Sequence, residues 1–286
     1  MTTIRHVLFP FDFSAQGAEV VPFVEAMALA LRAKVTILSV VPPTWDVPPA
    51  GMRRIIADTS IEAKRALQSH LDQSLTANFN GVESERVADS GDPALRITAY
   101  SDTHGVGLIM MPTHGLGPFR TLLMGSVTSK VLHDAACPVW TAVHAETQSS
   151  PVLPRKVLCA IDETPKAPAL LRWVSGFCKD LGASLTLIHV VEPITDWPSL
   201  ASERARQDHV REAALERVTA VQAAAGVEAP LIVGVGEVVQ TVTEQARRDG
   251  AELLIIGRGS VAEPFGRLRT HAFGIIQRSL CPVLSV

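Results

Sequence analysis

The chain has neither a long apolar run nor a long basic run, and these two absences limit its partners. No stretch of its 286 residues approaches the roughly eighteen apolar residues that a membrane-spanning helix needs. The formal net charge is −3, and no cluster of Lys and Arg supplies the electrostatic footprint of a nucleic-acid-binding protein. We therefore expect neither a membrane nor a nucleic acid as a partner.

Cysteine is also scarce. The four cysteines show neither C-x-x-C spacing nor the density of a disulfide scaffold, which fits a reducing compartment, and each is expected to be a small buried apolar residue. The N-terminal segment MTTIRHVLFPFDFS lacks the long apolar core and the cleavage site of a signal peptide. These features together predict a cytoplasmic protein.

Several signatures of catalysis and metal binding are missing. The sequence contains no G-x-x-x-x-G-K-S/T phosphate loop and no G-x-S-x-G nucleophile motif. Its nine histidines include His104 and His114, on either side of one predicted strand, and His133, close in sequence to Cys137, but they show no metal-ligand spacing such as H-x-x-x-H. Separate histidines are favoured over a zinc site, and we predict no catalytic residue and no metal ligand.

The sequence does contain an internal repeat. The segment IRHVLFPFD at Ile4–Asp12 recurs as PRKVLCAID at Pro154–Asp162, and VTILSVVP at Val35–Pro42 recurs as LTLIHVVE. A hydrophobic share of 47% gives enough material for two cores. The chain therefore reads as a tandem duplication, with domains at 1–146 and 155–286 and a polar, Pro-interrupted linker between them.

Strand and helix patterns alternate within the first copy. Predicted strands are Val7–Phe11, Val35–Val41, Glu83–Ala88, Leu108–Met111 and Val139–Val143. Helical patterns cover Ala15–Arg32 and Met52–Thr76, and further helices follow Asp92 and Gly125. Asp92 before Pro93 is a strong helix start signal. Five strands with helical crossovers predict a doubly wound α/β domain with a five-stranded parallel sheet in each copy.

Ligands of such sheets bind at the carboxyl ends of the strands, where the strand order switches. This rule brings together Pro10–Asp12, Val40–Val41 and the glycine-bearing loop Met111–Gly117. Ser126, after Gly125, is predicted to cap the next helix, whose N-terminus would attract an anion. The alternative is that these glycines serve only turn geometry.

Gly115, nine further residues and Gly125-Ser126 resemble the G-x-x-G, nine residues, G-S/T loop of the universal stress protein family. His114-Gly115 and Cys137-Pro138-Val139 are also similar to family motifs. The resemblance implies a Rossmann-like fold of the adenine nucleotide alpha hydrolase type. It also implies a stress-response module that binds ATP, accompanied by Mg²⁺, or a related adenine nucleotide.

The resemblance also implies a set of binding residues. Equivalents of Asp12 and Val41 lie against adenine and ribose in the family. The phosphates are surrounded by equivalents of Gly115, Gly125, Ser126 and Val127. Met111 and His114 complete the predicted site in the first copy.

The first copy departs from the family loop at one position. Pro112 stands where the first glycine belongs, and proline has no N–H to donate. This departure motivates an alternative, in which the protein is an ATP-independent interaction scaffold or accommodates another apolar or anionic ligand. A separate alternative is a slow adenine-nucleotide hydrolase, for which His114 and Asp12 are the obvious catalytic candidates.

The second copy departs further. It keeps Asp162 and Gly257, but Ser260 and Arg269 replace the next two glycines. We therefore expect ATP to bind poorly in the second copy.

The last strand of each copy is short and apolar, as Val139–Val143 and Val283–Val286 illustrate. Such strands would be exposed edges if they had no partner. Because the family commonly pairs through this strand, the resemblance implies an intramolecular pseudo-dimer, with a further homodimer left open.

Overall fold

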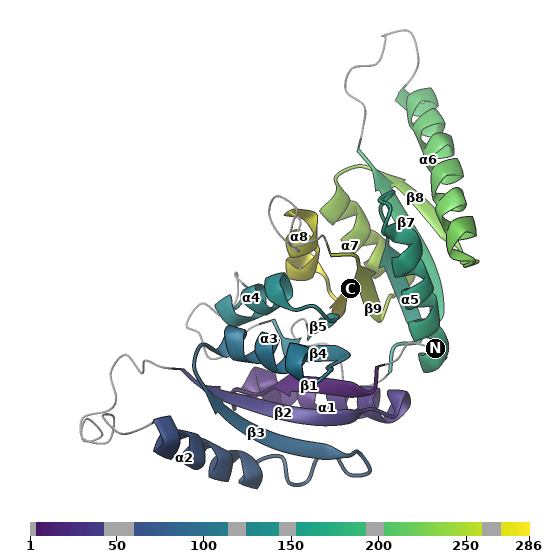
Figure 1. The fold of residues 1–286 in the computed structure, drawn as a ribbon. Helices are drawn as coiled ribbons and strands as arrows, with labels where there is room; N and C mark the ends of the chain where they lie inside the picture. Colours follow the sequence, from purple (N-terminus) through teal and green to yellow (C-terminus); the bar gives the residue numbers. More distant parts are fainter. Residues whose placement is uncertain (1–3, 43–59, 114–123, 143–152, 193–202, 259–269) are drawn as a thin grey trace. The chain divides into compact units, whose positions relative to one another are not determined.

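Strand and helix alternate along the described chain, in two units. The structure is a computed structural model that describes residues 4–42, 60–113, 124–142, 153–192, 203–258 and 270–286. Its contacts divide the chain into Thr3–Leu153 and Pro154–Val286. Within the described ranges each unit contains five strands and four helices (Figure 1). None of the described helices has both the length and the apolarity that a membrane crossing requires.

The first unit is built around a parallel sheet. Its elements are β1 (His6–Pro10), α1 (Ala15–Leu31), β2 (Lys34–Val41), α2 (Ser60–Gln73), β3 (Ser84–Ser90), α3 (Pro93–Thr103), β4 (Leu108–Pro112), α4 (Ser126–Asp134) and β5 (Val139–Ala142). The strand order is β3-β2-β1-β4-β5, with parallel pairing throughout. Right-handed crossovers put α1 and α2 on one face, while α3 and α4 pack together on the other (Figure 1).

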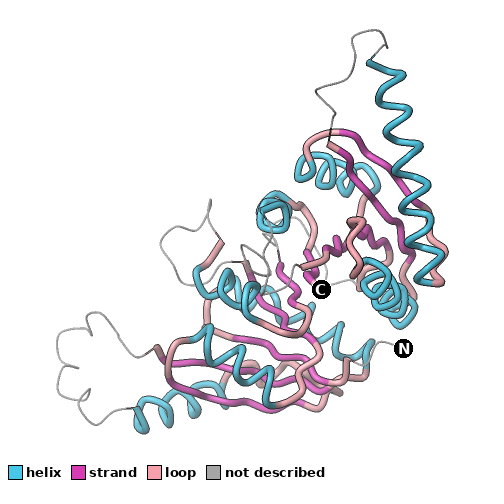
Figure 2. The backbone as a smooth tube through the Cα atoms, turned by 45° about the horizontal axis from the view of Figure 1, so that its top comes forward, coloured by secondary structure: helices cyan, strands magenta, loops and turns pink. Residues whose placement is uncertain are grey.

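The second unit repeats this topology. Its elements are β6 (Lys156–Ala160), α5 (Ala167–Leu181), β7 (Ser184–Val191), α6 (Glu203–Ala225), β8 (Leu231–Val235), α7 (Val238–Asp249), β9 (Leu253–Ile256), α8 (Thr270–Arg278) and β10 (Val283–Ser285). The order is β10-β9-β6-β7-β8, again parallel. In each unit the strands lie between helices (Figure 2). The predicted fold class and the tandem duplication are confirmed.

The two sheets are buried on both faces. Val7, Leu8 and Phe9 are consecutive residues of β1, and all three are fully buried. A run of buried residues in one strand requires cover on both sides, since successive side chains point to opposite faces. Burial also raises the pKa of the Cys178 thiol, to about 12, so Cys178 is a buried apolar residue rather than a nucleophile at neutral pH.

Some predicted element boundaries are met, and others shift. Asp92 caps α3 as predicted: its Oδ1 accepts from the Leu95 amide at 3.1 Å, and Pro93 is the first helical residue. The helix predicted to reach Thr76 ends earlier, at Gln73, and Leu75 just beyond it adopts a left-handed φ of 56°. The predicted start of that helix and most of the predicted linker lie outside the described residues.

Leu158→Ala tests the burial of the second core. Leu158 is 1% exposed, so its truncation should lower the free energy of unfolding by about 2–5 kcal/mol through lost apolar contact and a residual cavity. Urea unfolding of the full chain measures this loss. Leu280→Ala is the control, because Leu280 is 71% exposed and should change little. Equal losses in the two variants would contradict the described core.

Candidate functional site

The strand order of the first unit reverses between β1 and β4. These strands are direct neighbours, paired in parallel through Val7–Leu108 and Leu8–Ile109. Their carboxyl ends therefore leave the sheet at one edge, where open α/β sheets bind ligands. Asp12 follows β1, Met111 lies near the end of β4, and Val41 ends β2, the next strand along. The structure thus brings these three predicted site residues to one edge of the sheet.

Asp12 is held at the N-terminus of α1. Its Oδ1 accepts hydrogen bonds from the Ser14 amide at 3.0 Å and from the Ser14 hydroxyl at 2.5 Å. The Ser14 hydroxyl oxygen in turn accepts from the Gly17 amide at 2.9 Å, which caps the helix. These three contacts fix the carboxylate in one position at the carboxyl end of β1.

Gly17 lets the first turn of α1 approach Asp12 and Phe11 closely. A Cβ there would lie 3.1 Å from Asp12 Oδ1 and 3.2 Å from Phe11 Cδ2. The sequence reasoning missed both Ser14 and Gly17. Ser14 carried a usable signal, since it directly precedes a helical pattern, whereas a helix glycine carries none.

Phe13 turns the chain between Asp12 and Ser14. Its φ of 60° is left-handed, a conformation that costs a bulky residue of order 1–3 kcal/mol and persists only where the surroundings impose it. Its ring packs on Phe11 and on His70 of α2, with centroid separations of 4.9 Å and 4.6 Å. The corner that presents Asp12 is therefore held by packing as well as by hydrogen bonds.

The N-terminus of α4 is tied to the end of β4. The Gly125 amide donates to the Thr113 carbonyl at 2.9 Å, and the Thr128 hydroxyl donates to the Pro112 carbonyl at 3.1 Å. Thr113 itself donates to the Ala142 carbonyl at 3.2 Å. Both ends of the intervening loop are thus anchored at the sheet edge, while His114 and Gly115 lie outside the described residues.

The prediction that Ser126 caps α4 is wrong. Gly125 is the N-cap: its φ and ψ of −56° and 143° are not helical, and its carbonyl accepts from the Ser129 amide at 2.9 Å. Ser126 is the first helical residue, and Val127 follows it in the first turn. Because glycine has no side chain to accept from these amides, the first turn can serve an anion.

The second unit keeps the aspartate turn but starts its helix differently. Asp162 Oδ1 accepts from the Thr164 amide at 3.1 Å and from its hydroxyl at 2.6 Å. However, α5 begins only at Ala167, and its N-cap Lys166 makes no side-chain capping bond. Gly257 directly follows β9, and a Cβ there would lie 3.1 Å from Leu170 Cδ2. Ser260 and Arg269 lie outside the described residues.

Glu163 occupies the position that Phe13 has in the first unit. Its carboxylate contacts His189 Nε2 at 3.1 Å and accepts from Arg217 Nε at 2.7 Å. His189 Nδ1 lies 3.0 Å from the Ile161 carbonyl oxygen. The hydrogen bond from Arg217 holds the pKa of the Glu163 carboxyl below its usual value. A charged network thus replaces the aromatic contact of the first unit.

In the part of the chain that the structure describes, no three His, Cys, Asp or Glu side chains converge on a point that could hold a metal ion.

Ser14→Ala tests the anchored aspartate. Loss of the helix cap and of one hydrogen bond to Asp12 should cost about 1–2 kcal/mol of stability, measured by urea unfolding. Thr164→Ala is the matched control, because Thr164 bonds Asp162 in the same way without capping α5. A loss in Thr164→Ala as large as that in Ser14→Ala would argue against the capping role.

The charged network should make stability depend on pH. Because the folded-state pKa of Glu163 is depressed, the unfolded chain binds more protons as pH falls through the ordinary Glu range near about 4.3. Stability should therefore drop between about pH 5 and the lower folded-state pKa. Both Glu163→Gln and Arg217→Gln should flatten this slope in urea unfolding measured at several pH values. An unchanged slope in both variants would refute the contribution of the pair.

Comparison with known proteins identifies the family. The model of the universal stress protein family matches residues 3–142 and again residues 154–286. A 59-residue segment is 34% identical to the universal stress protein YxiE of Bacillus subtilis, covering 21% of this chain and 40% of that protein. A universal stress protein of Mycolicibacterium smegmatis is 23% identical over 217 residues, covering 73% of this chain and 71% of that protein.

A solved structure agrees in fold. The crystal structure of a universal stress protein from Archaeoglobus fulgidus has a TM-score of 0.70 and 21% identity, covering 99% of this chain and 98% of that one. Since the family model matches both halves of the chain, the chain belongs to the universal stress protein family and carries its domain twice, in tandem.

Proposed function

We propose that the first unit binds ATP or a related adenine nucleotide, and that the protein is a cytoplasmic regulatory module of the stress response. One observation carries this proposal: the fixed Asp12 carboxylate and the N-terminus of α4 follow neighbouring strands and lie at the same edge of the sheet. The carboxylate can accept hydrogen bonds from hydroxyl groups, and the helix N-terminus can bind phosphates. A nucleotide offers both.

Each part of the nucleotide has a candidate partner. Asp12 Oδ1 is engaged by Ser14, which leaves the second oxygen to accept from a ribose hydroxyl. Val41, which ends β2, provides an apolar edge for the base. The phosphates would meet Gly115, Gly125, Ser126 and Val127, with Met111 and His114 at the start of the loop. Mg²⁺ would be held mainly by the phosphates, as is usual for this ion.

Pro112 does not remove the main anion donors. It is the last residue of β4, in register with Ala142, and its carbonyl already accepts from Thr128. The amides of the α4 first turn belong to residues further along the chain. We therefore favour nucleotide binding over the ATP-independent scaffold that Pro112 suggests, and the proposal requires no chemical step.

The second unit is proposed to bind ATP poorly. Glu163, directly after Asp162, is occupied by His189 and Arg217, so this corner presents an ion network. In addition, Arg269 stands where the family has glycine. A bulky guanidinium there would meet a phosphate in place of backbone amides or exclude it.

The pseudo-dimer also stays a proposal. It is supported by the strand order within each unit, in which β5 and β10 are the end strands. Both strands are short and mostly apolar. Covering both would leave neither as a free edge for aggregation.

Denaturing freshly purified protein and identifying the released nucleotide tests the proposed function, together with ATP titration calorimetry. Wild type should hold about one nucleotide per chain in the first unit. Gly125→Arg should abolish binding, because a side chain would fill the approach to the α4 amides. Asp12→Asn should weaken binding by about tenfold, since a neutral amide replaces a charged acceptor while still bonding Ser14.

Asp162→Asn provides the matched control. It makes the same change in the second unit and should leave ATP affinity unaltered. If wild type neither carries nor takes up nucleotide, the scaffold is the better account. Weaker binding in Asp162→Asn than in Asp12→Asn would move the site to the second unit.

A further inference from the structure

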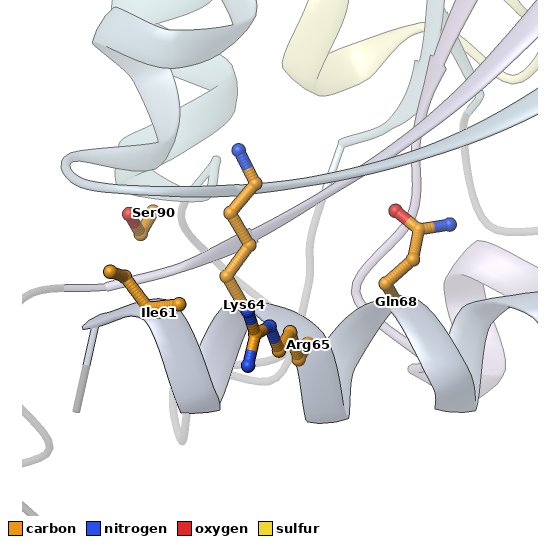
Figure 3. A pocket seen from close by; sticks show the side chains of 5 residues that line it. All are labelled: Ile61, Lys64, Arg65, Gln68 and Ser90. Atoms are coloured by element: carbon orange, nitrogen blue, oxygen red, sulfur yellow. The ribbon is translucent and has the colours of Figure 1, made fainter.

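A recess separate from the nucleotide site lies between α2 and the end of β3. It has a volume of about 340 Å³ and is lined by Ile61, Lys64, Arg65, Gln68 and Ser90 (Figure 3). Lys64 and Gln68 extend from α2 toward the strand, and Ser90 is the last residue of β3. No residue of the proposed nucleotide site contributes to its lining.

Gln68 fixes the inner wall of the recess. Its Oε1 accepts from the Ala88 amide at 2.8 Å, and its Nε2 donates to the Arg86 carbonyl at 3.0 Å and to Asp72 at 2.8 Å. The side chain therefore joins α2 to β3 through backbone groups of the strand. These bonds set the spacing between α2 and β3, the two elements between which the recess lies.

The recess carries an excess of positive charge. Lys64 Nζ and Arg96 Nε each lie 3.6 Å from Asp89, longer than a hydrogen bond, and Lys64 is half exposed. Among the residues that the structure describes, no carboxylate pairs with Arg65. The recess is thus lined by two cations and no carboxylate, in a chain whose net charge is −3. The local field favours an anion, against the charge of the whole protein.

The second unit lacks this excess. His70 of α2 and Arg217 of α6 both contact the residue that follows the strand-end aspartate, which aligns the two helices. In this alignment Lys64 corresponds to Arg211, Arg65 to Glu212 and Gln68 to Leu215. The positive charge of Arg211 is therefore offset by the negative charge of Glu212, and Leu215 cannot make the hydrogen bonds that Gln68 makes. The two copies therefore differ in the charge of this part of the helix.

We propose that this recess binds a small oxyanion, a molecule with phosphate or carboxylate groups. The guanidinium of Arg65 can engage two oxygens at once, and Lys64 supplies a second positive charge. Ile61, 64% exposed, offers an apolar wall to the body of the ligand. A volume near the lower end of ligand pockets, about 300–1,000 Å³, limits the ligand to a small molecule.

Calorimetric titration of the full chain with inorganic pyrophosphate, and separately with citrate, tests the proposal. At least one probe should bind to wild type, and Arg65→Gln should weaken that binding by about tenfold. Arg65→Lys should recover part of it, because the charge returns without the planar fork. Arg211→Gln is the matched control in the second unit and should have no effect.

Pyrophosphate binding alone would assign the site to phosphate compounds, and citrate binding alone to carboxylates; either supports the proposal. No heat with either probe would overturn it. It would also fall if Arg65→Gln bound as well as wild type while Gly125→Arg lost the heat, since the anion would then occupy the α4 N-terminus. Arg65 is exposed, so thermal unfolding of the variants should match wild type and rule out misfolding.

Discussion

The parallel pairing of β1 with β4 is the constraint on which the rest of the first unit depends. The chain first adds β2 and β3 on one side of β1, then returns to its other side. Because right-handed crossovers send the helices to opposite faces before and after this return, the connections that follow β1 and β4 diverge, which in open α/β sheets makes the crevice for a ligand. The chain leaves β1 through Asp12 into α1 and leaves β4 through Thr113 toward α4. The position of the proposed nucleotide site thus follows from strand order, and β6 and β9 repeat it in the second unit.

On this shared frame, the two copies diverge one residue after the strand-end aspartate. Phe13 packs on His70 in a left-handed conformation, whereas Glu163 joins His189 and Arg217 in an ion network. A second residue differs at the same corner, because His189 of β7 stands where β2 has Ser39. Each of these side chains contacts the carbonyl of the residue before the aspartate. One corner is packed by aromatic rings, and in the other the Glu163 carboxylate is engaged by His189 and Arg217. This physical difference supports a division of roles between the copies.

Much of the fold could be predicted from the sequence, because its signals are local or repeated. Val7, Leu8 and Phe9 of β1 form a continuous, fully buried apolar run, and Asp92 before Pro93 marks a helix start. The helix start at Gly125 could not be chosen over Ser126, since that choice depends on which carbonyl accepts from Ser129. Gly17 gave no signal, because only the folded chain brings Asp12 and Phe11 against it. The bonds from Gln68 to β3 were equally invisible, since they join positions far apart in the sequence.

Pro112 shows how a departure from a family motif can be accommodated by the fold. In the ladder between β4 and β5 it is Thr113, not Pro112, whose amide donates to Ala142, so the missing N–H costs this pairing nothing. The Pro112 carbonyl is used by Thr128 from α4, which ties the helix to the strand independently of the loop. A glycine here could adopt many backbone conformations, whereas proline fixes φ at the loop entrance. Proline therefore lowers the conformational entropy that the chain loses on folding. What the site loses is one flexible backbone position; the amides of the α4 first turn, which any phosphate would meet, are supplied by another part of the chain.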